Sequence, residues 1–193
     1  MSRFRTLSLV CLVGVVLVTA AGCSSDNKNT TATSKPAPVF GNLDPGVRVG
    51  VCGAYTIPNM KKILGGGKYF RVLAPTAIGE KGDPVTGETC SWQRTNAKGG
   101  DLVTLQVEAR NYGKDTAGLI SQMSQLQTAT NGATPVANLG EAAFSSVSAT
   151  STLLDVRKGG YFLTFSSRAE GKEPPVPLTT LQFLAGAALD KVK

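Results

Sequence analysis

The stretch VTLQVEAR at residues 103–110 carries the clearest structural signal in the chain. Its apolar and polar residues alternate throughout, which is typical of a strand that packs one face against a core. Residues 115–127 follow it with the spacing of an amphipathic helix. The residues expected to face inward from this helix are Leu119, Ile120, Met123 and Leu126. A strand followed by a helix that packs on its sheet is therefore predicted for the middle of the chain.

Three further strands are predicted on the C-terminal side, at residues 142–147, 152–157 and 161–167. The last two are separated by Lys158-Gly159-Gly160, which suits a tight hairpin turn. A final helix is expected to follow, with Thr179 or Thr180 as its N-cap. Its predicted inward stripe consists of Leu181, Leu184, Ala188, Leu189 and Val192.

On the N-terminal side, strands are predicted at residues 88–95 and 69–73, with a turn-rich segment between them. A short helix over residues 57–64 precedes them. Thr56 is its expected N-cap, and the glycines at 65–67 are expected to end it. Helix and strand signals thus flank the central strand on both sides.

Strands joined mostly by hairpins, together with three separate helices, predict an α+β fold. We expect a single domain over residues 46–193, with a largely antiparallel sheet, about three helices packed on it and one disulfide. Residues 23–45 are rich in Ser, Thr, Asn, Ala and Pro and lack apolar periodicity. Such a composition cannot bury enough apolar surface to offset chain entropy, so this segment is predicted to be a disordered tether.

Cys23 stands at the end of an apolar N-terminal run that opens with Arg3 and Arg5. A basic start, a short apolar stretch and small residues indicate a secretory signal, with an uncleaved signal anchor as the alternative. The small residues 20–22 before Cys23 resemble the box of bacterial lipoprotein signals. That resemblance implies that residues 1–22 are removed and that Cys23 is lipidated. We expect a lipid anchor in the cell membrane, on its extracytoplasmic face.

Cys52 and Cys90 are the two cysteines that remain once Cys11, inside the signal, and Cys23 are set aside. An even pair in an oxidising compartment predicts a structural disulfide. A redox-active pair is the alternative, but it normally has Cys-x-x-Cys spacing, which these residues lack. We therefore expect a structural disulfide between Cys52 and Cys90.

The chain contains no histidine, which excludes Ser-His-Asp and Cys-His catalysis and removes the commonest zinc ligand. Paired carboxylates could still support glycoside hydrolysis. The acidic residues weighed for that role are scattered: Asp101, Glu108, Asp115 and Glu141. Asp83, Glu88 and Asp101 bracket turn-rich loops that could form a cation site, although loop carboxylates are usually solvated. We therefore predict no catalytic residue, no metal site and no cofactor.

Basic residues outnumber acidic ones, with 20 Lys and Arg against 13 Asp and Glu and a formal charge of +7. The basic residues are scattered and form no stripe with interleaved aromatics, so nucleic-acid binding is not expected. Trp92 is predicted to pack in the core. Tyr112 is the aromatic expected to be exposed, and an interface role for it is a hypothesis. The tyrosines considered for the lining of a ligand groove are Tyr55, Tyr69, Tyr112 and Tyr161.

Three short motifs resemble those of the actinobacterial lipoproteins grouped as domain-of-unknown-function family 3558. They are Cys52 just before the helix at 57–64, the triplet Cys90-Ser91-Trp92, and Gly-Glu-Ala-Ala-Phe at residues 140–144. A hairpin strand and a C-terminal helix follow, and the resemblance covers about residues 44–192. It implies a disulfide-linked envelope domain and supplies no catalytic residues.

The leading functional hypothesis is a lipid-anchored, non-catalytic binding or interaction module whose partner is an envelope protein or lipid. One alternative is a carrier for an apolar envelope lipid, which needs a large interior cavity. A second is a histidine-free hydrolase, which needs two carboxyl groups that converge in one cleft. No pattern in the sequence assigns a ligand or an oligomeric state.

Overall fold

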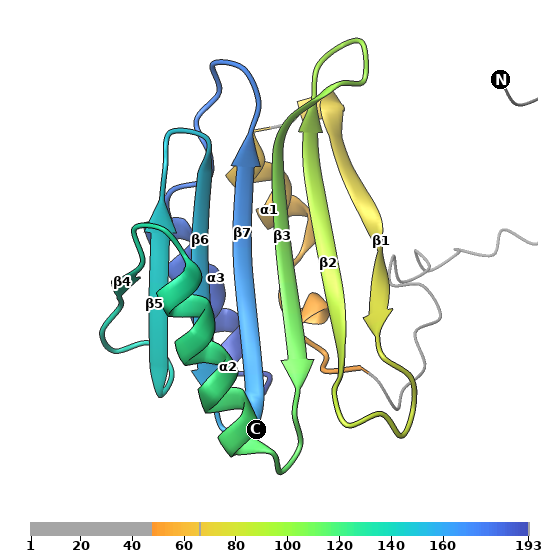
Figure 1. Cartoon of the computed structure of the whole chain (residues 1–193). Coiled ribbons are helices and arrows are strands. Elements are labelled where there is room, and N and C mark those ends of the chain that lie inside the picture. The colour runs from red at the N-terminus through yellow and green to blue at the C-terminus, as the bar shows by residue number, and fades with distance from the viewer. Residues whose placement is uncertain (1–47, 66, 193) are drawn as a thin grey trace, which may run out of the picture. The chain divides into compact units, whose positions relative to one another are not determined.

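A seven-stranded antiparallel sheet forms the middle layer of the domain, with its strands in the order β1-β2-β3-β7-β6-β5-β4 (Figure 1). The computed structural model describes residues 48–65 and 67–192. The strands are β1 (Phe70–Ile78), β2 (Thr86–Thr95), β3 (Asp101–Asn111), β4 (Thr134–Pro135), β5 (Ala142–Val147), β6 (Ser151–Lys158) and β7 (Tyr161–Ala169).

Three α-helices within the described residues cover the two faces of the sheet: α1 (Ile57–Leu64), α2 (Thr116–Ala129) and α3 (Leu178–Leu189). Figure 1 shows α2 in front of the sheet and α1 and α3 behind it. Two single 3-10 turns, η1 (Cys52–Ala54) and η2 (Gly67–Tyr69), flank α1. The predicted α+β fold, with an antiparallel sheet and three helices packed on it, is confirmed.

β3 and β7 join two antiparallel meanders at the centre of the sheet, one made of β1–β3 and the other of β4–β7. The stretch at residues 103–110 therefore lies in the middle of the sheet. Its apolar residues are buried in the core shared with α1 and α3: Val103, Leu105, Val107 and Ala109. The polar residues between them are half-buried on the opposite face, the side on which α2 packs. Period-two alternation thus directs each β3 side chain to one layer or the other.

The ends of α1 follow the predicted signals. The Thr56 side chain accepts a hydrogen bond from the backbone N–H of Asn59 at 3.4 Å, and Pro58 lies in the first turn. Gly65 ends the helix with a φ of +64°, a left-handed conformation that glycine adopts without steric cost. The predicted hairpin after Lys158 is also confirmed, because Gly159 and Gly160 form the turn between β6 and β7.

The predicted N-cap of the last helix is wrong. α3 begins at Leu178, and the N-cap position is held by Pro177 without a side-chain hydrogen bond. The fixed φ of proline already suits a helix start, so the helix begins before Thr179 and Thr180, which lie in its first turn. Much of the predicted stripe is buried, and Val192 is buried beyond the end of the helix.

Three further expectations differ from the structure. Ile120 of α2 was expected to face inward but is 50% exposed, because Leu119 and Met123, four residues apart, define the buried side of that helix. β1 extends to Ile78, past an irregularity in its pairing between Leu73 and Thr76. The short strand β4 was not predicted, since its two residues carry no periodic signal.

The predicted signal peptide, the tether and Cys23 lie outside the described residues. None of the helices within residues 48–65 and 67–192 is long and apolar enough to cross a membrane.

Candidate binding groove

The disulfide predicted between Cys52 and Cys90 is present, with the two Cα atoms 5.7 Å apart. It ties the turn η1, just before α1, to the middle of β2. Trp92, two residues further along β2, is buried in the core as predicted. The ring of Tyr55 meets the Trp92 ring edge-on, with centroids 5.5 Å apart. The disulfide and this aromatic pair together fix the chain that leads into α1.

A groove of about 620 Å³ lies between α1 and α3, on the face of the sheet opposite α2. Its lining comes from the chain just before α1, from α1 itself and from the first three turns of α3: Ala54, Tyr55, Asn59, Met60, Lys62, Ile63, Thr179, Thr180, Phe183, Leu184 and Ala187. Most of these side chains are apolar. The two walls are more than a hundred residues apart in the sequence, and the sheet beneath brings them together.

The floor of the groove is made of buried side chains. Met60 and Leu184 are buried, and the Tyr55 hydroxyl donates a hydrogen bond to the backbone carbonyl of Leu184 at 3.1 Å. Burial raises the pKa of the Tyr55 phenol well above its ordinary value, so the hydroxyl stays protonated and keeps this bond. The bond joins the chain before α1 directly to α3, and it holds the two walls at a fixed spacing.

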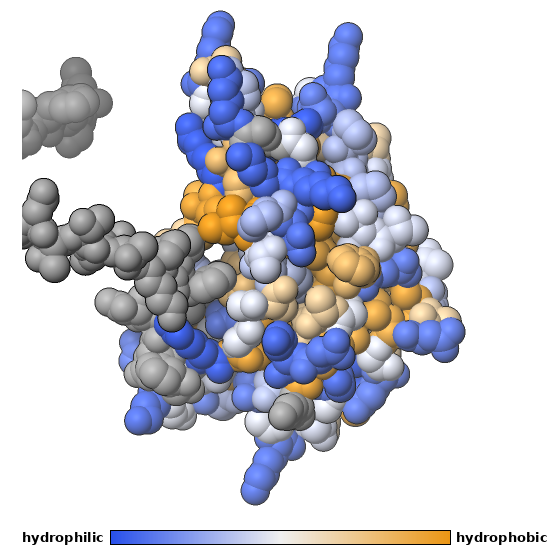
Figure 2. Space-filling model, turned by 180° about the vertical axis from the view of Figure 1, so that it is seen from behind, coloured by the Kyte–Doolittle hydropathy of each residue, from blue (hydrophilic) through white to orange (hydrophobic). Residues whose placement is uncertain are grey.

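The rim of the groove combines one large exposed apolar residue with polar ones. Phe183 of α3 is 73% exposed, the largest exposed fraction among the large apolar side chains of the described residues. Asn59, Lys62 and Thr180 also line the groove. Figure 2 views the molecule from this side and shows hydrophobic surface in patches separated by hydrophilic side chains. An apolar channel with a few polar groups at its edge is the usual form of a small-molecule site.

A second hollow of about 270 Å³ lies next to this groove, at the C-terminal end of α1. It is lined by the C-terminal end of α1, by the segment that leads into α3, and by residues of β2 and β3: Ile63, Leu64, Gly65, Arg94, Val103, Glu173, Pro174, Pro175, Val176 and Pro177. Ile63 lines both hollows. We call the two hollows together the α1–α3 seam.

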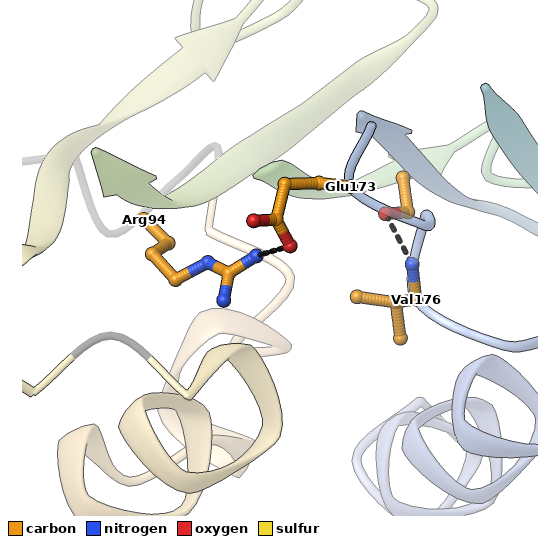
Figure 3. A network of polar contacts seen from close by, with 4 residues as sticks. Arg94, Glu173 and Val176 are labelled. Atoms are coloured by element: carbon orange, nitrogen blue, oxygen red, sulfur yellow. Dashed lines mark hydrogen bonds and ion pairs between the residues drawn. The ribbon is translucent and has the colours of Figure 1, made fainter. Parts of the chain in front are cut away.

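Two residues that line the smaller hollow, Arg94 and Glu173, form an ion pair, which makes this end of the seam polar. The Arg94 Nη2 lies 2.5 Å from the Glu173 Oε2, and the two side chains point toward one another (Figure 3). The backbone N–H of Val176 donates a hydrogen bond to the Ser167 hydroxyl at 2.9 Å, which fixes the segment that carries Glu173. The Nε of Arg94 is buried and has no hydrogen-bond partner.

A third hollow of about 420 Å³ lies on the other side of the molecule, between α2 and the strands β4 and β5. Ile120 and Arg157 are among its lining residues. Arg157 pairs with Glu141 at 2.5 Å. This second arginine–glutamate pair is a natural comparison for Arg94 and Glu173, since it also borders a hollow.

The acidic residues weighed for a cation site are not brought together. Glu88 is 2% exposed and accepts a hydrogen bond from the backbone N–H of Cys52, whereas Asp83 accepts one from the backbone of Glu80 in a turn. Asp101 accepts a hydrogen bond from Gln93. Among the described residues there is no group of three or more His, Cys, Asp or Glu side chains that could hold a metal ion.

The carboxylates weighed for hydrolysis are also engaged separately. Glu108 contacts Arg110 at 2.6 Å, Glu141 contacts Arg157, and Asp115 caps the N-terminus of α2 by accepting a hydrogen bond from the Gly118 N–H. None of these carboxylates is among the residues that line the three hollows described above. These carboxylates therefore do not converge on a cleft.

Asp155 was missed in the sequence. It is 4% exposed in the middle of β6, and its Oδ1 accepts a hydrogen bond from the Thr164 hydroxyl at 2.5 Å. Burial raises the pKa of this carboxyl to about 6, against the opposite effect of the Thr164 hydrogen bond. The signal that could have found it is a carboxylate in the middle of the predicted strand at residues 152–157. In the structure, Asp155 lies beside Thr164, and Thr164 beside Glu108, in one polar row of the sheet.

The tyrosines divide between the two sides of the sheet. The prediction that Tyr112 is exposed is wrong: it is 7% exposed, packs in the core under α2, and its hydroxyl donates a hydrogen bond to Gln122. The turn into α2 folds that helix back over the end of β3, which covers the ring. Tyr69 and Tyr161 lie outside the groove, and Tyr55 is the member of the set that lines it.

Comparisons with known proteins add little. No protein-family model and no curated protein matches the chain. A solved structure of a GTP-binding regulator from Thermotoga maritima is similar at 11% sequence identity with a TM-score of 0.37, over 70% of this chain and 85% of that one.

Proposed function

We propose that this protein is a lipid-anchored binding module, held on the extracytoplasmic face of the cell membrane through Cys23, that binds an apolar chain in the groove between α1 and α3. The observation that carries the proposal is the groove itself. Its volume of about 620 Å³ falls within the range of about 300–1,000 Å³ that small-molecule sites occupy.

The apolar lining supports a chain-like ligand. Burying a methylene group of a ligand is worth about 0.8 kcal/mol, so several such groups are needed to offset the cost of association. The groove lining on α3 runs from Thr179 to Ala187, a length of ~12 Å at the rise of an α-helix. An extended alkyl chain can lie along such a channel and contact both helices.

A binding module fits this shape better than the two alternatives. A carrier that encloses a whole lipid needs an interior cavity, whereas this groove lies between two surface helices and has the exposed Phe183 on its rim. A hydrolase needs converging carboxylates, and Glu108 and Glu141 are each paired with an arginine in different places. The groove lining also contains no carboxylate.

Photolabelling tests the proposal on the full chain. The protein is reconstituted in phosphatidylcholine nanodiscs and exposed to dodecan-1-ol that carries a diazirine on its alkyl chain. After irradiation, mass spectrometry locates the labelled peptides. We expect label on the peptides of α1 and α3 and its loss when unlabelled dodecan-1-ol is added in excess. Label spread evenly over all exposed peptides, without competition, would contradict the proposal.

A further inference from the structure

The α1–α3 seam has an apolar end and a charged end. The larger hollow uses α1 from Asn59 to Ile63 and α3 from Thr179 onward. The smaller hollow continues with α1 from Ile63 to Gly65, and with residues 174–177, which lead into α3. The two hollows therefore lie next to one another, and Ile63 lines both. A ligand chain that extended from the larger hollow past Ile63 would reach the hollow that Arg94 lines.

Arg94 has hydrogen-bonding capacity to spare at that end. A guanidinium carries five N–H donors in a fixed fork that matches a carboxylate. Its Nη2 contacts Glu173, while its Nε is buried with no hydrogen-bond partner. The Nη1 faces the C-terminal end of α1, where a Cβ added to Gly65 would lie 3.9 Å from it. The guanidinium therefore has donors beyond the one that contacts Glu173, and a carboxylate can accept from them.

Glu173 shows which chemical group this end accepts. Its carboxylate already contacts the Arg94 guanidinium, at 2.5 Å. The pair is partly open to solvent, with side-chain exposures of 23% for Arg94 and 38% for Glu173. Ion pairs of this kind contribute little to stability, so an incoming carboxylate can take the place of Glu173 at small cost.

We propose that the α1–α3 seam binds a long-chain carboxylate, with its alkyl chain in the larger hollow and its carboxylate on Arg94 in place of Glu173. This inference rests on the proposed function, because it assumes that the larger hollow takes an alkyl chain. It adds the class of the ligand and gives Glu173 a role as a competing carboxylate within the chain.

Two photoreactive probes of equal length separate head-group recognition from chain binding. The full chain in phosphatidylcholine nanodiscs is labelled with diazirine-bearing dodecanoic acid, at a pH that ionises it, or with the matching dodecan-1-ol. The measured quantity is the ratio of acid to alcohol label on the peptides of α1 and α3. Comparing ratios between variants cancels the partition of each probe into the bilayer.

Arg94→Gln and Glu173→Gln are expected to shift this ratio in opposite directions. A charge-assisted hydrogen bond is worth about a tenfold change in binding, so Arg94→Gln should lower the ratio by about tenfold. Glu173→Gln removes the competing carboxylate and should raise the ratio severalfold. Arg157→Gln and Glu141→Gln form the matched control, because that pair has the same 2.5 Å contact and borders the hollow under α2. They should leave the ratio unchanged.

The outcomes distinguish this inference from the proposed function. If both probes label α1 and α3 but the ratio is the same in all variants, the inference is wrong and the proposed function stands. If neither probe labels these helices, both are wrong. Should Arg94→Gln fail to fold, Glu173→Gln decides alone, and an unchanged ratio in that variant overturns the inference.

Discussion

The backbone N–H of Cys52 donates a 2.8 Å hydrogen bond to the Oε1 of Glu88, two residues before the cysteine that holds the Cys52 sulfur. The turn η1 is thus tied to β2 twice, once covalently and once by a buried carboxylate. Glu88, Cys90 and Trp92 alternate onto the same face of β2. This double attachment positions Tyr55, and through it the start of α1 and one wall of the groove.

Replacing Glu88 by leucine should destabilise the domain. The change leaves the Cys52 N–H buried without an acceptor, a loss of about 1–3 kcal/mol in the free energy of unfolding. Glu88→Gln is the matched control, because its amide oxygen can still accept the bond, and it should cost less than Glu88→Leu. Urea unfolding with the disulfide intact measures both. Equal losses in the two variants would show that this hydrogen bond is not what matters at Glu88.

Removing the disulfide should lower the free energy of unfolding by more than Glu88→Leu does. The bond closes a loop with a sequence separation of 38 residues, which the chain-entropy account converts to about 4 kcal/mol. The double variant Cys52→Ser, Cys90→Ser is expected to lose that amount in urea unfolding. A reductant should destabilise the unaltered protein and leave the double variant unaffected. If the reductant destabilised the double variant by a similar amount, the effect of the reductant would not come from the Cys52–Cys90 disulfide.

Asp155 should make stability depend on pH in the direction opposite to that of most aspartates. Its pKa is raised from 3.8 to about 6 in the folded protein, so the folded state holds the proton more tightly than the unfolded state does. The stability that this proton contributes is fully present below about pH 4 and is lost as the pH rises through about 6. A pKa shift of this size corresponds to a change of about 3 kcal/mol at most in the free energy of unfolding.

Asp155→Asn isolates this effect, because asparagine imitates the protonated carboxyl and can still accept the Thr164 hydrogen bond. The variant should match the unaltered protein near about pH 4 and exceed its free energy of unfolding by about 1–3 kcal/mol near about pH 7. Asp101→Asn, at an exposed position, gives the effect of removing a charge alone. An Asp155→Asn variant less stable than the unaltered protein at both pH values would overturn the prediction.

Local patterns in the sequence were sufficient for most of the fold. Residues 103–110 alternate because β3 has a core on one face and polar surroundings on the other, and that alternation is visible without a structure. Thr56 and Gly65 mark the ends of α1 through local backbone chemistry. Tyr112 could not be placed in this way, because its burial depends on how α2 folds back over β3.

The groove itself was beyond sequence reasoning, since its walls meet only in three dimensions. The Tyr55 hydroxyl and the Leu184 carbonyl are 129 residues apart. One local signal was available: Phe183 lies off the buried stripe formed by Leu181, Leu184 and Ala188, so α3 carries a large apolar residue on a second face. An exposed aromatic gains meaning when it borders an apolar groove, as Phe183 does here, and that setting is visible only in the structure.

Phe183 therefore provides the sharpest separation of binding from stability. Because its side chain is 73% exposed, Phe183→Ser should change the free energy of unfolding by no more than about 0.5 kcal/mol. Leu184→Ala, next to it but buried, should cost about 2–5 kcal/mol.

Photolabelling of α1 and α3 by the diazirine-bearing dodecan-1-ol should fall severalfold in Phe183→Ser, because one side of the apolar channel is lost. Val147→Ser, another exposed apolar residue but on β5, should leave labelling unchanged. Equal labelling of the Phe183→Ser and Val147→Ser variants would mean that the alkyl chain does not lie against Phe183.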